Sequence, residues 1–167
     1  MKNTILYTSE AFLVEGGRPL RGKVRVSGSK NASLPILMAS ILTDQTCQIE
    51  NVPDLLDTRT TLELLQNLGV EAEFKEGRVS LNAKYLRSYE APDEMVRRMR
   101  ASVLVMGPLL ARFGKAVVSM PGGCSIGVRS IDQHLKVFER AGAHIEIKHG
   151  YIHLELKEIK PVEYTFE

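Results

Sequence analysis

The sequence contains one structural pattern twice, and this internal repeat constrains the fold more than any other feature. Residues 64–81 read as a helix end, a glycine, an alternating strand, a second glycine and another strand, and residues 137–154 repeat that order. The first glycine is Gly69 in one copy and Gly142 in the other, and the offset of 73 residues also holds at the second glycine. Glycine just past a helix supplies a left-handed cap, and alternation afterwards predicts half-buried strands. We therefore expect duplicated α/β units.

Upstream of these strands the two copies differ in length. Pro53 corresponds to Pro121 with an offset of only 68 residues, so the second copy has five extra residues before Gly142. The extra length falls at the glycine-rich stretch Pro121-Gly122-Gly123-Cys124-Ser125-Ile126-Gly127. Packing of a repeat does not require such a loop, which indicates a functional role.

Each copy is expected to run helix, strand, helix, strand, strand, and a further strand over residues 23–26 is expected before the first. The helices near 32–42 and 102–112 are apolar around much of their circumference, which predicts that they lie inside. The helices near 58–68 and 131–141 are more amphipathic and are expected to cover the outside. The predicted fold class is α/β, with sheets outside some of the helices.

Composition and charge exclude several classes of protein. Of the 167 residues 44% are hydrophobic and 25% are charged, as in globular proteins, and the net charge of +2 is too small to indicate a nucleic-acid surface. No apolar run is long enough to span a bilayer and the first residues do not resemble a signal peptide, which predicts a cytoplasmic protein with no membrane partner. Cys47 and Cys124 are then expected to be free thiols. The histidines between 144 and 153 have no acidic or cysteine cluster beside them, so no metal site is predicted.

The first candidate site is the turn Ser27-Gly28-Ser29-Lys30-Asn31, between the expected strand and helix. A glycine-serine turn that enters a helix exposes backbone N–H groups and the positive end of the helix dipole, and Lys30 adds a full charge. These features suit a phosphate or a carboxylate. An ordinary helix start, capped by Ser29 or Asn31, also explains the turn and is the commoner case.

The second candidate site is Arg97-Arg98-Met99-Arg100, directly before the second apolar helix. Lys30 and Arg98 occupy equivalent positions in the two copies, so both units bring cations to the same end of an inner helix. Arg100 is nearest to the apolar stretch and is expected to point inward. A solvated basic face is the alternative explanation.

The third candidate site is Cys124 in the inserted loop. Arg129 follows five residues later, and a helix is expected to begin nearby. A thiol close to cations and to a helix N-terminus can act as a nucleophile or as an acid. Structural cysteines favour buried elements, which describes Cys47 in its strand-like run but not Cys124 in its glycine loop. The pattern favours a functional thiol at Cys124.

Together these stretches resemble the UDP-N-acetylglucosamine 1-carboxyvinyltransferase family, which acts in bacterial peptidoglycan synthesis. The resemblance covers nearly the whole chain from Leu20 onward. It is carried by Gly28-Ser29-Lys30-Asn31-Ala32, Asn51-Val52-Pro53, Met99-Arg100-Ala101-Ser102, Gly107-Pro108-Leu109-Leu110-Ala111-Arg112-Phe113-Gly114 and the cysteine loop. The enolpyruvyl transferase of the shikimate pathway is similar in its repeated fold but lacks the cysteine loop, so it is a poorer match.

The resemblance implies an inside-out α/β barrel of repeated βαβαββ units that transfers the enolpyruvyl group of phosphoenolpyruvate to the 3-hydroxyl of UDP-N-acetylglucosamine. It implies that Lys30 and Asn31 contact both substrates, that Arg100 and Arg129 neutralise phosphate and carboxylate groups, and that Cys124 donates a proton. Lys30 and Cys124 would be the catalytic residues, with no metal and no cofactor. Four consecutive residues are implied to line the UDP-sugar site: Ser130, Ile131, Asp132 and Gln133.

By the same resemblance the chain is expected to be incomplete, because family members are more than twice as long and contain six units. Residues 1–20 are expected to pair with a second domain that this sequence lacks, and residues 21–84 to form the first unit. Residues 85–160 are expected to form the second unit, with the cysteine loop at 121–129, and residues 161–167 to begin a third. We expect the chain alone to be inactive and to act with a C-terminal half, which another chain can supply. The alternative is a noncatalytic module that binds sugar nucleotides or anions.

Overall fold

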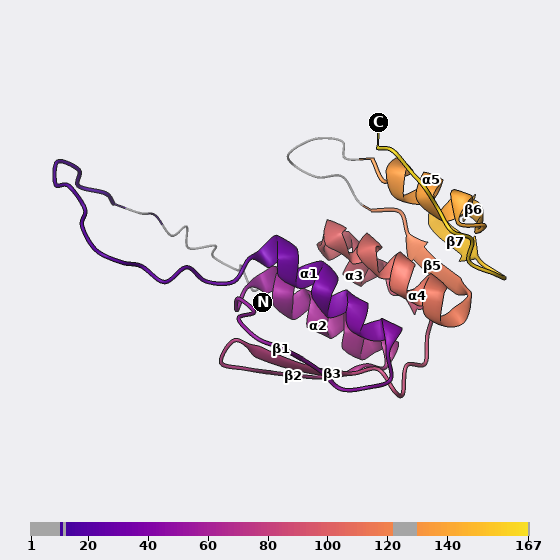
Figure 1. Ribbon diagram of the computed structural model, residues 1–167, viewed down its shortest axis with the longest axis horizontal. Coiled ribbons are helices and arrows are strands. Elements are labelled where there is room, and N and C mark those ends of the chain that lie inside the picture. The colour runs from indigo at the N-terminus through magenta and orange to yellow at the C-terminus, as the bar shows by residue number, and fades with distance from the viewer. Residues whose placement is uncertain (1–10, 12, 122–129, 167) are drawn as a thin grey trace, which may run out of the picture.

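The computed structural model describes residues 11, 13–121 and 130–166, and within them two sheets enclose a layer of helices (Figure 1). The first sheet has the strand order β1-β3-β2 and is antiparallel, with β1 (Cys47–Ile49), β2 (Glu71–Lys75) and β3 (Arg78–Asn82). The second sheet has the order β4-β5-β7-β6, with β4 (Glu90–Ala91), β5 (Lys115–Ser119), β6 (His144–Lys148) and β7 (Tyr151–Glu155). In the second sheet β4 is parallel to β5 and the other pairs are antiparallel.

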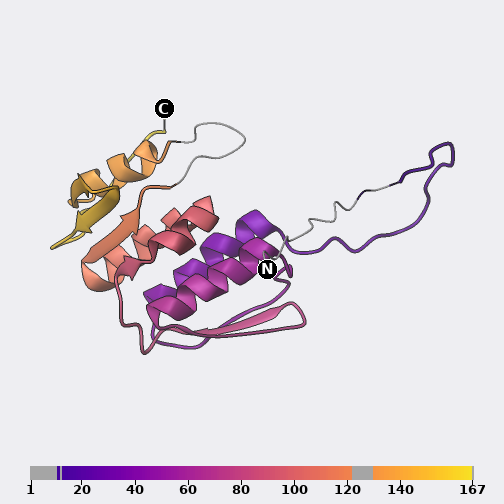
Figure 2. The ribbon, with the colours of Figure 1, turned by 180° about the vertical axis from the view of Figure 1, so that it is seen from behind.

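The helices of the two copies meet between the sheets (Figures 1 and 2). The first copy contributes α1 (Lys30–Ala39), the short 3₁₀ helix η1 (Ser40–Leu42) and α2 (Leu56–Leu68). The second contributes α3 (Asp93–Arg98), the 3₁₀ helix η2 (Arg100–Val105), α4 (Met106–Phe113) and α5 (Asp132–Arg140). Helix α1 packs against α2 and η2, while α4 packs against β5 and η1. None of the helices in this part of the chain is long and apolar enough to cross a bilayer.

The internal repeat is confirmed by the strand order, because β5-β7-β6 reproduces β1-β3-β2. The two hairpins also share one turn: Glu76 and Gly77 have φ values of 49° and 78°, and His149 and Gly150 have 51° and 81°. Two consecutive positive φ values define the tight hairpin turn whose twist matches that of its strands. The glycines predicted to end the second helix of each copy match as well, with φ values of 103° and 101°.

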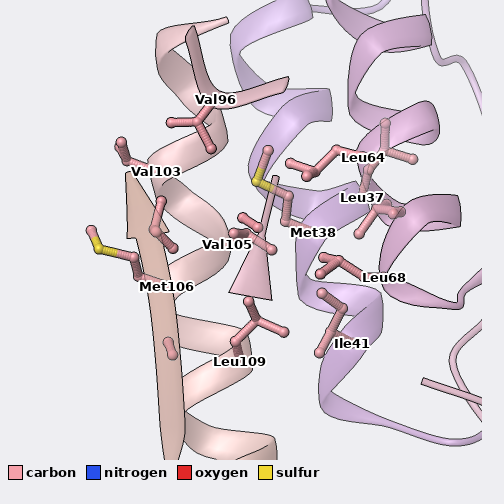
Figure 3. Close-up of a cluster of buried hydrophobic side chains, with 14 of the residues drawn as sticks. Leu37, Met38, Ile41, Leu64, Leu68, Val96, Val103, Val105, Met106 and Leu109 are labelled. Carbon is pink, nitrogen blue, oxygen red and sulfur yellow. The ribbon is translucent and has the colours of Figure 1, made fainter. Parts of the chain in front are cut away.

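Large apolar side chains from both copies form one core between the sheets (Figure 3). Leu37 and Met38 of α1, Leu64 of α2, Val105 of η2 and Leu109 of α4 are all fully buried. Figure 3 shows the side chains of α1 and α2 directed toward those of η2 and α4. The two apolar helices of the repeat therefore lie inside, as their pattern predicted.

The prediction that the helix near residues 58–68 covers the outside is confirmed for one face of α2, where Arg59, Glu63, Gln66 and Asn67 are exposed. Its other face packs against α1, α3 and β2. The buried residues are Thr58, Thr60, Thr61, Leu62, Leu64, Leu65 and Leu68. Three polar threonines are thus buried, which the amphipathic pattern did not predict. Helix α5, which has no buried residue, lies at the surface as predicted.

Residues 23–26 do not form the strand that their alternation predicts. Val24 and Val26 are 90% and 82% exposed, and no strand in the described part of the chain pairs with this stretch. A strand requires a neighbour that supplies hydrogen bonds. In the second copy β4 pairs with the outer edge of β5, whereas among the described residues the equivalent edge of β1 is open. Residues 161–166 form no strand either, so the start of a third unit stays a prediction.

Candidate functional site

An open pocket of about 500 Å³ lies where the N-terminal ends of α1 and η2 approach residues 130–134. Its polar lining residues are Lys30, Asn31, Asp57, Arg98, Arg100, Ser130 and His134. They come from both copies of the repeat. The two ends that the sequence predicted to carry cations therefore meet in one place.

Ser29 fixes the start of α1 and with it the position of Lys30. The Ser29 Oγ accepts a hydrogen bond from the Ala32 backbone N–H at 3.3 Å, and the Ser29 carbonyl accepts one from the Ser33 N–H at 2.9 Å. Lys30 is the first residue of the helix, where N–H groups have no partner within the helix and the dipole is positive. Ser29 can therefore cap the helix while the same turn offers a site to an anion.

Gly28 allows this turn to pack directly on residues 51–53. A Cβ placed on Gly28 would lie 1.7 Å from the Asn51 carbonyl oxygen and 3.3 Å from Cδ of Pro53. Asn51 has a φ of 57°, in the left-handed region that asparagine tolerates better than most residues. Two of the stretches that carry the family resemblance therefore contact each other, and this contact fixes the turn that precedes Lys30.

Asp57 pairs with Lys30 in the pocket, and sequence reasoning did not identify it. Lys30 Nζ lies 2.7 Å from Asp57 Oδ2, and the two side chains are 44% and 34% exposed. Asp57 belongs to the first turn of α2, where the positive end of the helix dipole also stabilises a negative charge. The sequence shows only that Asp57 lies at the start of the helix that follows the Asn51-Val52-Pro53 stretch, and this position does not by itself indicate Lys30 as its partner.

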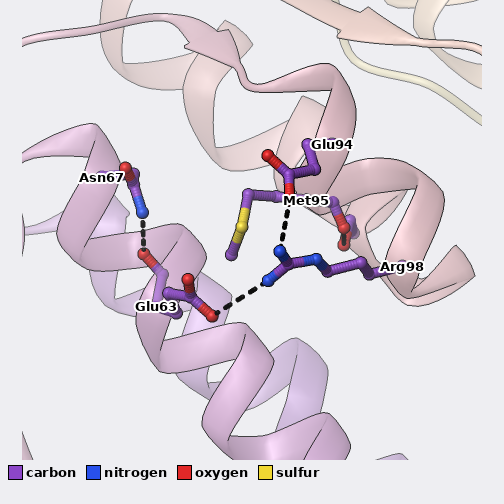
Figure 4. A network of polar contacts seen from close by, with 6 residues as sticks. Glu63, Asn67, Glu94, Met95 and Arg98 are labelled. Atoms are coloured by element: carbon purple, nitrogen blue, oxygen red, sulfur yellow. Dashed lines mark hydrogen bonds and ion pairs between the residues drawn. The ribbon is translucent and has the colours of Figure 1, made fainter. Parts of the chain in front are cut away.

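Arg97 and Arg98 are both engaged with carboxylates. Arg97 Nε donates to Asp93 Oδ2 at 2.7 Å, and this hydrogen bond lowers the pKa of Asp93. Arg98 donates to Glu94, and its Nη1 lies 3.7 Å from Glu63 Oε2 (Figure 4). For Arg97 the alternative of a solvated basic face describes the structure well, whereas Arg98 also lines the pocket.

Arg100 differs from its two neighbours. It is half-buried and lines the pocket, as its predicted inward position requires. Its Nη2 donates to the Ser130 carbonyl oxygen at 3.4 Å, and among the described residues no carboxylate pairs with it. Arg100 is therefore the pocket cation that is most available to an anion.

The four residues implied to line a UDP-sugar site do not share one environment. Ser130 and Ile131 line the pocket, whereas Asp132 and Gln133, the first residues of α5, do not. A hydrogen bond from the Ser130 side chain lowers the pKa of Asp132. The Gln133 Oε1 accepts a hydrogen bond from the Tyr164 hydroxyl at 2.6 Å. Asp132 and Gln133 thus form hydrogen bonds with other side chains of the protein and do not line the pocket.

Of the remaining predicted residues, some line the pocket, and others lie elsewhere or outside the described residues. Asn31 lines the pocket as expected, and His134 lines it as well. Cys124 and Arg129 lie outside the described residues. Cys47 is partly buried on β1 and packs against the core, which fits its interpretation as a structural cysteine.

Helices enclosed between repeated sheets are the fold class of the enolpyruvyl transferases. The crystal structure of the enolpyruvyl transferase NikO from Streptomyces tendae is similar with a TM-score of 0.72 and 26% identity, over 87% of this chain and 32% of that one. EPSP synthase from Acinetobacter baumannii is similar with a TM-score of 0.63 and 21% identity, over 86% and 34%, and supports the fold alone. The predicted fold class is therefore confirmed.

The chain belongs to the EPSP synthase (3-phosphoshikimate 1-carboxyvinyltransferase) family, whose sequence pattern matches residues 14–167. It is 47% identical over 159 residues to the UDP-N-acetylglucosamine 1-carboxyvinyltransferase of Acinetobacter baylyi, which is 95% of this chain and 38% of that protein. It is 52% identical over 151 residues to UDP-N-acetylglucosamine 1-carboxyvinyltransferase 2 of Carboxydothermus hydrogenoformans, over 90% and 36%. The chain thus spans well under half the length of these relatives, and the resemblance drawn from its motifs is confirmed.

Proposed function

We propose that this chain is part of a transferase that moves the enolpyruvyl group of phosphoenolpyruvate to the 3-hydroxyl of UDP-N-acetylglucosamine, in peptidoglycan synthesis. The observation that carries the proposal is the convergence of Lys30, Asn31 and Arg100 on one pocket. They do so in a chain about half identical to proteins of that name. The proposed substrates are anionic, and both cations come from equivalent ends of the repeated inner helices.

In the proposed reaction the 3-hydroxyl of the sugar gives its proton to a base while its oxygen bonds to C2 of phosphoenolpyruvate. The C2–C3 double bond takes up a proton at C3, which gives a tetrahedral adduct. The bond from C2 to the phosphate oxygen then breaks, phosphate leaves, and C3 loses a proton so that the double bond forms again. Preorganised cations stabilise the charges of such a reaction without reorganising. Lys30 and Arg100 are the proposed partners of the phosphate and carboxylate, and Asn31 is a neutral hydrogen-bonding group beside them.

The proposal extends to further residues that the family resemblance implies. Cys124 is proposed to give C3 its proton and to react with the epoxide fosfomycin, and Arg129 is proposed as a further cation. Residues 130–133 are proposed to contact the UDP-sugar. The proposed setting is the cytoplasm, where the product would serve cell-wall growth, shape and division. The rest of the catalytic site is proposed to come from a C-terminal half, on this chain's natural continuation or on another chain.

A graft into a relative tests the proposal. Residues 14–167 would replace the matching segment of the Acinetobacter baylyi transferase, and phosphate release that requires both substrates would be measured. The graft should turn over, and Arg100→Ala in it should reduce turnover by a factor of about 10² or more. The matched control is Arg97→Ala, because Arg97 pairs with Asp93 and does not line the pocket.

Two results would count against the proposal. One is a graft that folds with a cooperative thermal transition but releases no phosphate. The other is a graft in which Arg100→Ala and Arg97→Ala behave alike. For the chain alone, turnover should be at background. Micromolar binding of UDP-N-acetylglucosamine by the chain alone, with an inactive graft, would favour the noncatalytic binding module.

A further inference from the structure

The pocket contains a carboxylate among its cations, and this combination affects which anion it can accept. Lys30 Nζ already has Asp57 Oδ2 at 2.7 Å. Arg98 is paired with two glutamates that do not line the pocket. Arg100 has no carboxylate partner in the described part of the chain. An incoming anion therefore meets one uncompensated cation, Arg100, and two cations that are already paired, Lys30 with Asp57 and Arg98 with its two glutamates.

Asp57 has a second oxygen available to a ligand. Its Oδ2 pairs with Lys30 Nζ, and no residue that the structure describes donates a hydrogen bond to its Oδ1. The side chain is 34% exposed and lines the pocket. An ionised carboxylate can accept hydrogen bonds but cannot donate them. A ligand at Lys30 therefore gains where it directs a hydroxyl to Asp57, and loses where it presents only acceptor oxygens.

We propose that Asp57 is a specificity-determining residue, which selects oxyanions that carry a hydroxyl group over fully deprotonated oxyanions of the same size. The proposal rests on the proposed function only for the identity of the natural ligand. If that function is correct, the charge and the hydroxyl group come from the two substrates. Inorganic phosphate keeps at least one P–OH at neutral pH, whereas sulfate has none, and the two ions have nearly the same size. One hydrogen bond to a charged group in a partly exposed site corresponds to about tenfold in affinity.

The test uses the 167-residue chain and inorganic anions. Phosphate and sulfate would be titrated at neutral pH and constant ionic strength, and binding followed by the NMR shifts of the backbone amides of Lys30 and Asn31. The wild-type chain should bind phosphate about tenfold more tightly than sulfate. Asp57→Asn should reduce this ratio to about one, mainly because sulfate binds better, since the amide can donate to it.

Asp54→Asn is the matched control. Asp54 lies just before α2, three residues from Asp57, and is also paired, with Arg59 Nε at 2.7 Å, but it does not line the pocket. It removes the same charge, so it should leave the ratio of phosphate to sulfate affinity unchanged. If Asp57→Asn does not fold, the wild-type chain alone can still overturn the proposal, because arsenate keeps a hydroxyl and should follow phosphate, while selenate should follow sulfate.

Four outcomes would overturn the proposal: no binding of either anion at these amides, equal binding of both by the wild-type chain, a ratio that survives Asp57→Asn, or a ratio that Asp54→Asn also removes. The proposed transferase function is tested separately. A graft without turnover would not change the measured ratio of phosphate to sulfate affinity. Turnover by an active graft would not depend on that ratio either. Failure of one can therefore be told from failure of the other.

Discussion

Replacement of Gly28 by alanine should destabilise the protein through a single contact. The added Cβ would lie 1.7 Å from the Asn51 carbonyl oxygen, and real Cβ atoms essentially never approach closer than 3.0 Å. Either the turn or Asn51 must therefore move by more than about 1 Å. Overpacking of this kind costs about 1–3 kcal/mol, and loss of the Ser29 cap from a displaced helix start adds about 1 kcal/mol. We expect Gly28→Ala to lower the free energy of unfolding by about 2–4 kcal/mol.

Urea unfolding followed by circular dichroism measures this loss. With a slope of about 2 kcal/mol per molar urea, the midpoint should fall by about 1–2 M while the slope stays the same. Gly107→Ala is the control, because a Cβ there would meet Phe138 Cζ at 3.6 Å, an ordinary contact. Its helix-propensity gain is opposed by the following Pro108, so its effect should stay within about 1 kcal/mol. A midpoint for Gly28→Ala that matches the wild type, or equal losses at both glycines, would refute the reasoning.

Three further predictions concern the core, an ion pair and the C-terminal segment. Leu64→Ala removes a fully buried side chain and should cost about 2–5 kcal/mol in urea unfolding, so a loss below about 1 kcal/mol would contradict its place in the core. The Lys115 Nζ hydrogen bond to Glu155 at 2.9 Å lowers the pKa of Glu155 below its ordinary 4.5, so the pair should stabilise the fold above that pH and lose this effect as pH falls through the folded pKa. Thermal midpoints of Glu155→Gln should therefore lie below the wild type at neutral pH and converge with it in acid, and a constant gap would count against this. Tyr164→Phe removes the hydroxyl bond to Gln133 and should cost about 0.5–1.5 kcal/mol, with faster amide exchange in α5; unchanged exchange would show that the bond does not hold that helix.

The sequence predicted best those features that local chemistry decides. The hairpin turns at Gly77 and Gly150 and the cap at Ser29 depend on residues a few positions apart, and all three are present. Arg100 lines the pocket, as predicted for the inward cation, because the apolar stretch that follows it must enter the core. In each case neighbouring residues carried the whole signal.

Features that depend on distant partners were predicted less well. The burial of the threonines of α2 follows from packing against α1, β2 and α3, and the amphipathic pattern of α2 alone does not reveal these neighbours. The Lys30–Asp57 pair joins residues from different helices, and neither helix alone indicates it. Residues 23–26 show the reverse case, because their alternation is local while a strand also requires a partner edge.

The division of the pocket between the two copies gives any ligand there a mechanical role. Lys30 and Asp57 belong to one copy, whereas Arg100 and Ser130 belong to the other. A bound ligand is therefore a cross-link between two structural repeats, in addition to their shared core and the Arg98–Glu63 ion pair. At a concentration one hundred times its dissociation constant, it would add about 2.7 kcal/mol to the free energy required to separate them. Saturation should thus make the two halves of this domain unfold more nearly as one cooperative unit.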